Sequence, residues 1–180
     1  MKNKRAAMEM SVGTIVTIVL LMSVLVLGIV LTKSIFESSK GAIDMTDQQL
    51  QSEISKLFGE EDSKLVIYPT SKKLILKKDD NDAIGLGIKN IADNVNAPTS
   101  FSYEILYRDN DCGLTQKQVE DWIRIGGTEE NIPIAIGDFS SPKIEFRASE
   151  GTPKCLASFR VNVKRGGEVY VSDTFTIEHK

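Results

Sequence analysis

Two cysteines are the residues of this chain that could form a covalent bond with each other. Cys112 and Cys155 lie in segments next to a glycine and a proline, and the chain has no third cysteine. An even count in an oxidising compartment favours a disulfide, which would close a loop of about forty residues and stabilise a small domain by about 2–4 kcal/mol. The alternative is a pair of buried free thiols. We predict the Cys112–Cys155 bond if this part of the chain lies outside the cell.

Few other side chains are of the kinds that catalyse reactions or hold cofactors. The single histidine, His179, lies next to the last residue, so a His-based triad, an HExxH helix and a zinc cluster are excluded. Gly85 and Gly87 form a Gly-x-Gly pair inside an alternating strand pattern, without the lysine and helix start of a phosphate loop. We expect neither an enzyme nor a bound cofactor.

Acidic residues cluster in two short segments, 79–82 (Asp-Asp-Asn-Asp) and 109–111 (Asp-Asn-Asp). Their oxygens could be ligands for Ca²⁺, but neither segment has the remaining spacing of a recognised calcium loop. Asp and Asn are also the residues that favour turns. We interpret both segments as turns and expect no metal site.

The charges are distributed unevenly along the 180 residues. The net charge is -3, and the first nine residues carry +2 because Lys2, Lys4 and Arg5 outnumber Glu9, so the remainder carries -5. An acidic remainder without a basic stripe argues against a nucleic-acid partner. A chain of this length has room for one domain of ordinary size beside a membrane segment.

The segment Ser11–Leu31 contains 21 residues without a charge, which as a helix would cross a bilayer core of about 30 Å. Its polar side chains Thr14, Thr17 and Ser23 can bond back to the preceding turn. A buried helix and a removed secretory signal are the alternatives, but the run is apolar on all sides and is longer than a signal core. Because positive charge stays inside, we expect residues 1–10 to be a cytoplasmic leader and residues 32–180 to lie outside.

The run KRAAMEMSVGTIVTIVLLMSVLVLGIV resembles the start of archaeal type IV pilin-like and archaellin-like proteins, which carry a class III signal. The resemblance covers about the first 35 residues. It implies that a prepilin-peptidase-like enzyme cuts before the apolar stretch and that the freed helices self-associate into a filament core. The Gly-Phe-Thr signature of bacterial type IV pilins is absent.

Individual leader residues take roles from this resemblance. Lys4 and Arg5 match the basic recognition pair, Ala6 or Ala7 flanks the cut, and Glu9 matches the acidic residue that docks on a neighbouring subunit. A carboxylate at the edge of an apolar segment needs a partner such as a terminal ammonium. A cut after Ala6 leaves Glu9 third in the mature chain, whereas many bacterial pilins place this residue fifth. In an uncleaved anchor Glu9 would simply lie among the headgroups.

Residues 32–60 have the pattern of an amphipathic stalk helix with a narrow apolar seam. Continuous with the membrane segment, such a helix would run from about Ser11 to Phe58, although Gly41 weakens it locally. In the alternative, the seam docks on the chain's own domain. The seam residues are Phe36, Ile43, Leu50, Ile54 and Leu57.

Residues 61–180 change from a helical to an alternating period. About seven short strands separated by Asp, Asn, Gly and Pro turns predict an antiparallel, Ig-like β-sandwich, so the whole chain is expected to be α+β. Gly166 and Gly167 predict a tight hairpin turn before the last strand. The predicted strands are 64–68, 73–78, 83–90, 100–107, 143–147, 156–164 and 168–177, with a further short one at 132–136.

One helix, residues 114–125, is expected to interrupt the strands, because Thr115 and Gln118 match a capping box. Trp122 on its apolar face is either a packed core residue or an anchor for a partner protein.

The sequence favours a structural cell-surface protein: a pilin-like subunit that assembles into an extracellular filament for adhesion or motility. The alternative is an uncleaved single-pass anchor in membrane lipid whose β-sandwich binds an envelope or surface protein. An accessory component that fixes a filament base to the envelope is a third hypothesis.

Overall fold

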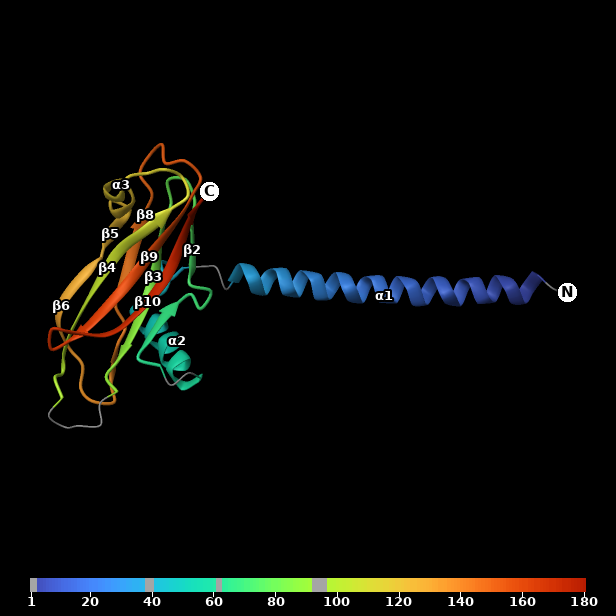
Figure 1. Cartoon of the computed structure of the whole chain (residues 1–180). Coiled ribbons are helices and arrows are strands. Elements are labelled where there is room, and N and C mark those ends of the chain that lie inside the picture. The colour runs from blue at the N-terminus through green and yellow to red at the C-terminus, as the bar shows by residue number, and fades with distance from the viewer. Residues whose placement is uncertain (1–2, 38–40, 61–62, 92–96) are drawn as a thin grey trace. The chain divides into compact units, whose positions relative to one another are not determined.

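The computed structural model describes residues 3–37, 41–60, 63–91 and 97–180, and within the first range it describes side chains for residues 13–32. The chain divides into two compact units, Met1–Ser38 and Ser39–Lys180. The first contains helix α1 (Asn3–Glu37). The second, the β-rich unit, contains all the other elements (Figure 1).

Three hydroxyl side chains in the apolar part of helix α1 bond to the helix's own backbone. The hydroxyl of Thr17 donates to the carbonyl of Gly13 at 2.8 Å, and that of Ser23 donates to Val19 at 2.8 Å. Thr32 does the same to Gly28 at 2.7 Å. The bonds of Thr17 and Ser23, which the sequence predicted, satisfy these hydroxyl groups inside the helix.

The first sheet of the β-rich unit has the strand order β1-β3-β8-β5, with β7 also paired to β3. All of its pairings are antiparallel. Six successive residues of the central strand β3, from Ala83 to Ile88, are buried, so this strand is covered on both faces. The strands are β1 (Leu65–Tyr68), β3 (Asn81–Lys89), β5 (Ile123–Ile125), β7 (Phe139–Ser140) and β8 (Lys143–Arg147).

The second sheet has the order β2-β10-β9-β4-β6. The glycines at 166 and 167 adopt φ angles of 59° and 91°, which confirms the tight hairpin between β9 and β10. Its strands are β2 (Lys73–Leu76), β4 (Ser100–Asn110), β6 (Thr128–Pro133), β9 (Cys155–Arg165) and β10 (Glu168–His179).

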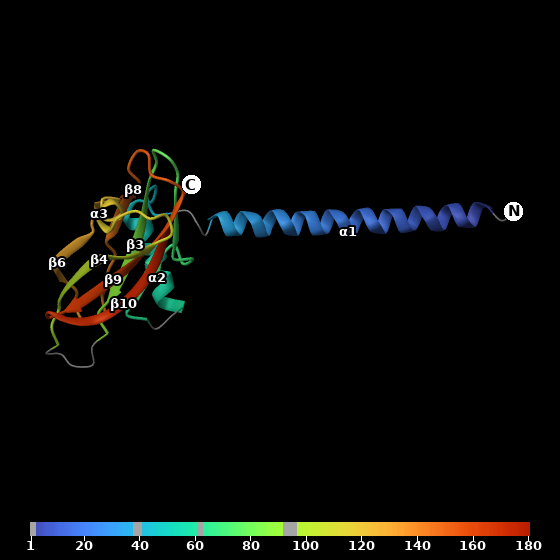
Figure 2. The same ribbon diagram turned by 45° about the horizontal axis from the view of Figure 1, so that its top comes forward.

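The main apolar core lies between the two sheets. Figure 2 shows β4, β9 and β10 of the second sheet side by side. The ring of Phe146 in β8 lies 5.8 Å from that of Phe159 in β9 and 5.8 Å from that of Phe175 in β10. Phe159 and Phe175 stack at 5.4 Å within the second sheet. An antiparallel pair of inward-facing aromatic residues therefore meets a third from the opposite sheet.

The structure corrects three expectations about the elements. The pair β2–β10 is parallel, whereas an antiparallel sandwich was predicted. Strand β2 belongs to the second sheet, although its neighbours in sequence, β1 and β3, belong to the first. The predicted helix 114–125 is only α3 (Gln116–Glu120), since Ile123–Ile125 pairs with β8 as β5. The predicted strand at 132–136 lies earlier, within β6.

The continuous stalk helix is also wrong. Residues 41–46 are not helical, and a new helix, α2 (Asp47–Glu60), begins after them. Thr46 and Gln49 form a capping box there: the backbone N–H of Thr46 donates to Oε1 of Gln49 at 2.9 Å, and Gln49 N–H donates to Oγ1 of Thr46 at 3.3 Å. This cap satisfies the first turn of a separate helix and sets its start. The two compact units meet near residue 39, within the predicted stalk segment 32–60.

Helix α2 packs on the outer side of the first sheet, beside β1 and β3 (Figure 1). Leu50, Ile54 and Phe58 are buried against Val66 and Ala83 in a second apolar cluster. The two glycines of the Gly-x-Gly pair make room for this helix. A Cβ at Gly87 would lie 2.5 Å from Cγ2 of Ile54, and a Cβ at Gly85 would overlap Leu50.

Candidate functional site

The segment Gly13–Thr32 of α1 is long and apolar enough to cross a membrane. Its 20 residues correspond to about 30 Å of helix, the thickness of a bilayer core. None of this segment is buried in the structure, and its large side chains are 48% (Ile18) to 67% (Leu27) exposed. A helix that is apolar on all sides requires lipid or partner helices around it, so it can act as a membrane anchor or as a signal sequence.

The leader residues Lys4, Arg5, Ala6, Ala7 and Glu9 belong to the helical backbone of α1. Their side chains, and that of Phe36, lie outside the described residues. Their roles in processing and docking stay predictions.

The other seam residues, Ile43, Leu50, Ile54 and Leu57, all belong to the β-rich unit. Leu50 and Ile54 are 1% and 0% exposed, and Ile43 and Leu57 pack against the same cluster. The seam therefore packs on the chain's own β-rich unit, which was the alternative to a stalk. These side chains do not form an intermolecular stalk. Phe58, at 8% exposed, completes the packed face and was not part of the predicted seam.

The segment before α2 is fastened to β3 by backbone bonds and one carboxylate. The N–H of Ala42 donates to the carbonyl of Ala83 at 2.6 Å, and Ala42 is fully buried. The carboxylate of Asp82 accepts from the backbone N–H groups of Ala83 and Gly41. A side chain at Gly41 would overlap this carboxylate, so the close approach requires glycine.

Burial raises the pKa of the Asp82 carboxyl to about 6. Its two backbone hydrogen bonds act in the opposite direction, whereas the nearby charges of Asp80 and Asp44 add to the increase. Asp82 is thus a half-buried acid whose protonation changes in the mildly acidic range.

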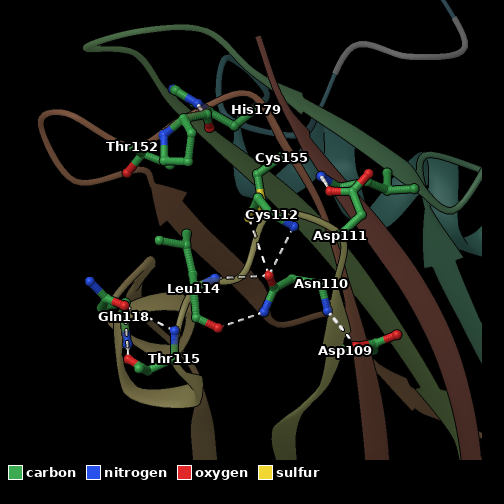
Figure 3. The surroundings of a disulfide bond; sticks show 12 residues. Asp109, Asn110, Asp111, Cys112, Leu114, Thr115, Gln118, Thr152, Cys155 and His179 are labelled. Atoms are coloured by element: carbon green, nitrogen blue, oxygen red, sulfur yellow. Dashed lines mark hydrogen bonds between the residues drawn. A yellow bond between two sulfur atoms is a disulfide. The ribbon is translucent and has the colours of Figure 1, made fainter.

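The predicted disulfide is present. Cys112, after β4, is bonded to Cys155, the first residue of β9, with 5.2 Å between their Cα atoms (Figure 3). Strands β4 and β9 are neighbours in the second sheet. The bond therefore joins the segment that follows β4 to the first residue of β9. The Asp111 carboxylate lies near both sulfurs, but these sulfurs are bonded to each other and are not thiolate ligands.

Asn110 organises the turn that carries Cys112 (Figure 3). Its Oδ1 accepts from the backbone N–H of Cys112 at 3.1 Å and of Leu114 at 3.1 Å. Its Nδ2 donates to the hydroxyl of Tyr107 at 2.7 Å and to the carbonyl of Leu114 at 2.8 Å. One side chain thus satisfies four polar groups. Sequence reasoning assigned the segment 109–111 to a turn but did not single out this residue.

Asp111 fastens the same turn to β9. Its Oδ1 accepts from the backbone N–H of Leu156 at 2.8 Å, and its own N–H donates to the carbonyl of Leu156 at 3.2 Å. The other acidic segment, 79–82, behaves similarly, since Oδ1 of Asp80 accepts from Asn81 N–H at 3.0 Å. These carboxylate oxygens serve the chain's own backbone.

His179 and Trp122 lie near the disulfide. His179 pairs with Cys155 in the β9–β10 register and is 6% exposed, and its Nδ1 is 2.9 Å from the carbonyl oxygen of Pro153, to which it must donate. The Trp122 ring is 0% exposed and lies 6.4 Å from that of His179. Trp122 is therefore a core residue and has no exposed surface to offer a partner.

A pocket of about 130 Å³ opens beside Trp122. Its walls come from residues 114–122, which include α3, and from residues 149–153, which connect β8 to β9. Polar side chains line it, among them Gln118, Asp121 and Glu150.

No family model and no curated protein matches the chain. Among solved structures, the chain is similar to the crystal structure of a Niemann-Pick type C2 protein from the Japanese carpenter ant, with 12% identity over 66% of this chain and 90% of that one. The TM-score of this match is 0.40.

Proposed function

We propose that the protein is a pilin-like structural subunit of the cell surface, held by α1 in the membrane before assembly and in the core of an extracellular filament afterwards. The observation that carries the proposal is the all-round apolar surface of Gly13–Thr32, none of which is buried among the residues that the structure describes. Lipid and identical neighbouring helices are the two environments that suit such a surface. The leader resemblance, with its basic pair before the apolar stretch, adds self-association and processing by a prepilin-peptidase-like enzyme.

The proposed orientation places the N-terminus in the cytoplasm and the β-rich unit outside. Lys2, Lys4 and Arg5 precede the apolar segment, and positive charge is retained inside. The Cys112–Cys155 disulfide fits an oxidising exterior. In fold, we propose an Ig-like sandwich in the broad architectural sense, with two departures: the parallel β2–β10 pair and a disulfide that joins strands of one sheet.

An uncleaved membrane anchor is the second candidate. The observation that favours it is the burial of Leu50 and Ile54 within the β-rich unit, because these side chains are no longer available to extend helix packing beyond the membrane. In this function the β-rich unit would bind an envelope or surface protein while α1 only anchors it.

The mature N-terminus distinguishes these functions. We would express the full chain in a host with the processing enzyme, sequence the N-terminus of the membrane and filament fractions, and look for filaments by electron microscopy. A new N-terminus at Ala6 or Ala7 together with filaments supports the subunit. An intact leader without filaments supports the anchor, and an N-terminus after Leu31 shows a removed signal and contradicts both.

A matched pair of variants sharpens this experiment. Arg5→Gln should block the cut and the filaments, because it removes half of the basic pair. Lys64→Gln, an exposed lysine of the β-rich unit, should leave both unchanged.

A further inference from the structure

Residues 41–45, which precede α2 on the side of the chain that leads to α1, are held on the first sheet by little apolar surface. The N–H of Ala42 donates to the carbonyl of Ala83 at 2.6 Å, and Nζ of Lys143 in β8 donates to the carbonyl of Met45 at 3.4 Å. Ala42 is fully buried, but its side chain is a single methyl group, and Met45 is only half-buried. A segment held in this way can open without unfolding the rest of its unit.

Helix α2 is held independently of this segment. Leu50 and Ile54 are buried in the second apolar cluster, and the capping box of Thr46 and Gln49 satisfies the first turn of the helix. Residues 41–45 can therefore leave the sheet while α2 stays on it. Their release would add up to about 17 Å of extended chain to the covalent connection between α1 and the β-rich unit.

Three carboxylates meet where the segment touches β3. Asp44 belongs to the segment, whereas Asp80 and Asp82 belong to the turn into β3 and to its first residues. The Asp82 carboxylate accepts from the N–H of Gly41, and a side chain at Gly41 would overlap it. Opening of the segment returns Asp82 to water and takes Asp44 away from the other two carboxylates. The charged form of Asp82 thus favours the open segment, and the neutral form favours the closed one.

Burial is the largest cause that raises the pKa of Asp82 to about 6, and the charges of Asp80 and Asp44 add to the increase. In the adjacent strand β8, the residue opposite Asp82 is the apolar Phe146. The other charged residues of the neighbouring elements are Asp47 of α2, Lys143, Glu145 and Arg147 of β8, and Lys77, Lys78 and Asp79 of the turn before β3.

We propose that Asp82 and residues 41–45 form a proton-operated latch, which is closed in mildly acidic surroundings and opens more readily at neutral pH. The closed state holds the proton of Asp82 more tightly than the open state does. The stabilisation by this proton is therefore fully present below about 3.8 and is lost as the pH rises through 6. The latch makes the length of the connection to α1 respond to acidity, and it stands whether the protein is a filament subunit or an anchor.

Hydrogen exchange of single amides tests the latch in the full chain. We would measure exchange in a zwitterionic detergent at pH 5 and pH 8 and correct each rate for the intrinsic effect of pH. The protection of the Ala42 amide should fall about fivefold from pH 5 to pH 8, since Asp82 is partly exposed. At pH 8 it should be at least about tenfold lower than that of Phe159 in the central strand β9. Equal protection of the two amides would show that the segment opens only with the whole unit and would overturn the proposal.

Variants separate the proton from the geometry. Asp82→Asn should abolish the fivefold fall, whereas Asp109→Asn, an exposed carboxylate of β4, should keep it. Gly41→Ala should lower the protection of Ala42 at least about threefold at both pH values, because the new side chain displaces the carboxylate. The protection of Phe159 reports that each variant is folded. A fall that persists in Asp82→Asn, or a Gly41→Ala chain protected like the native one, would contradict the latch.

Discussion

Leu50 of α2 lies directly on Gly85 of β3, so that a Cβ at Gly85 would occupy the position of the leucine side chain. Gly85→Ala should therefore push α2 away from the sheet and lower the free energy of unfolding by about 1–3 kcal/mol. Chemical denaturation followed by Trp122 fluorescence measures this, since the buried ring becomes exposed on unfolding. The double variant Gly85→Ala with Leu50→Ala should show coupling, because the shortened side chain leaves room for the new methyl group.

Gly59→Ala, in helix α2, is the matched control for Gly85→Ala in β3. A Cβ at Gly59 meets nothing within 4 Å, so the substitution should raise stability by about 0.5–1 kcal/mol through helix propensity alone. Equal destabilisation by both alanines would contradict the packing of α2 on the glycines.

Stability should depend on pH through Asp82. The pKa of this carboxyl is about 6 in the folded chain and 3.8 without its surroundings, so the folded state holds the proton more tightly. The contribution is fully present below about 3.8 and is lost as the pH rises through 6. Because the group is partly exposed, we expect a difference of about 1 kcal/mol between pH 4 and pH 8.

Asp82→Asn should remove this pH dependence and raise stability at pH 8. The amide retains an oxygen that accepts from Ala83 and Gly41, but it carries no charge to desolvate. Urea unfolding at both pH values measures the effect, with Asp109→Asn, an exposed carboxylate of β4, as the control. A variant as pH-dependent as the native chain would show that another group is responsible.

Removing the disulfide by Cys112→Ser and Cys155→Ser together should lower the free energy of unfolding by about 2–4 kcal/mol. Reduction of the native chain should have a similar effect. Intact mass spectrometry without reductant should find the native chain two hydrogens lighter than its reduced form, and two thiols that react freely would contradict the bond.

Asn110→Ala should destabilise the β-rich unit by about 2–3 kcal/mol, since it leaves several polar groups of the turn without partners. Asn110→Asp should be intermediate: it keeps the acceptor for Cys112 and Leu114 but loses the donor. Asn162→Ala on the same sheet should change stability by less than about 0.5 kcal/mol. Thermal unfolding of the three variants gives the order.

Val24→Lys should weaken membrane insertion of α1 by about 2.5–3.5 kcal/mol, because Val24 lies near the middle of the apolar segment. Leu31→Lys, at the end of the segment, should cost much less, since a terminal lysine can extend its amine to the interface. Extraction at alkaline pH compares the two, and equal retention of both variants in the membrane would argue against a span.

The sequence predicted the elements that depend on local pattern. The alternation of Ala157, Phe159, Val161 and Val163 indicated β9 and its buried face, and paired glycines indicated the hairpin after it. The disulfide followed from cysteine count and position. These features need only neighbouring residues or simple arithmetic.

Features that depend on distant partners were missed or were left as open alternatives. The apolar seam of Leu50, Ile54 and Leu57 has the same spacing whether it faces another helix or the chain's own sheet, and only the glycines of β3 decide between them. Ile123–Ile125 continues an amphipathic helix in pattern, but pairing with β8 makes it a strand. The Thr46–Gln49 capping box was readable and would have divided the stalk.

The pocket beside Trp122 could not be predicted, because its walls are 27 or more residues apart in sequence and meet through the disulfide and the core.

The parallel pairing of β2 with β10 sets an order of events during synthesis. Lys73 of β2 is opposite Thr176 of β10, 103 positions later, and β10 separates β2 from every other strand of its sheet. While the chain is being made, α1 is complete and can enter a bilayer long before this sheet can close. The β-rich unit must then wait, with β2 unpaired, until nearly all of its residues have left the ribosome, and any chaperone that guards it has to act during that interval.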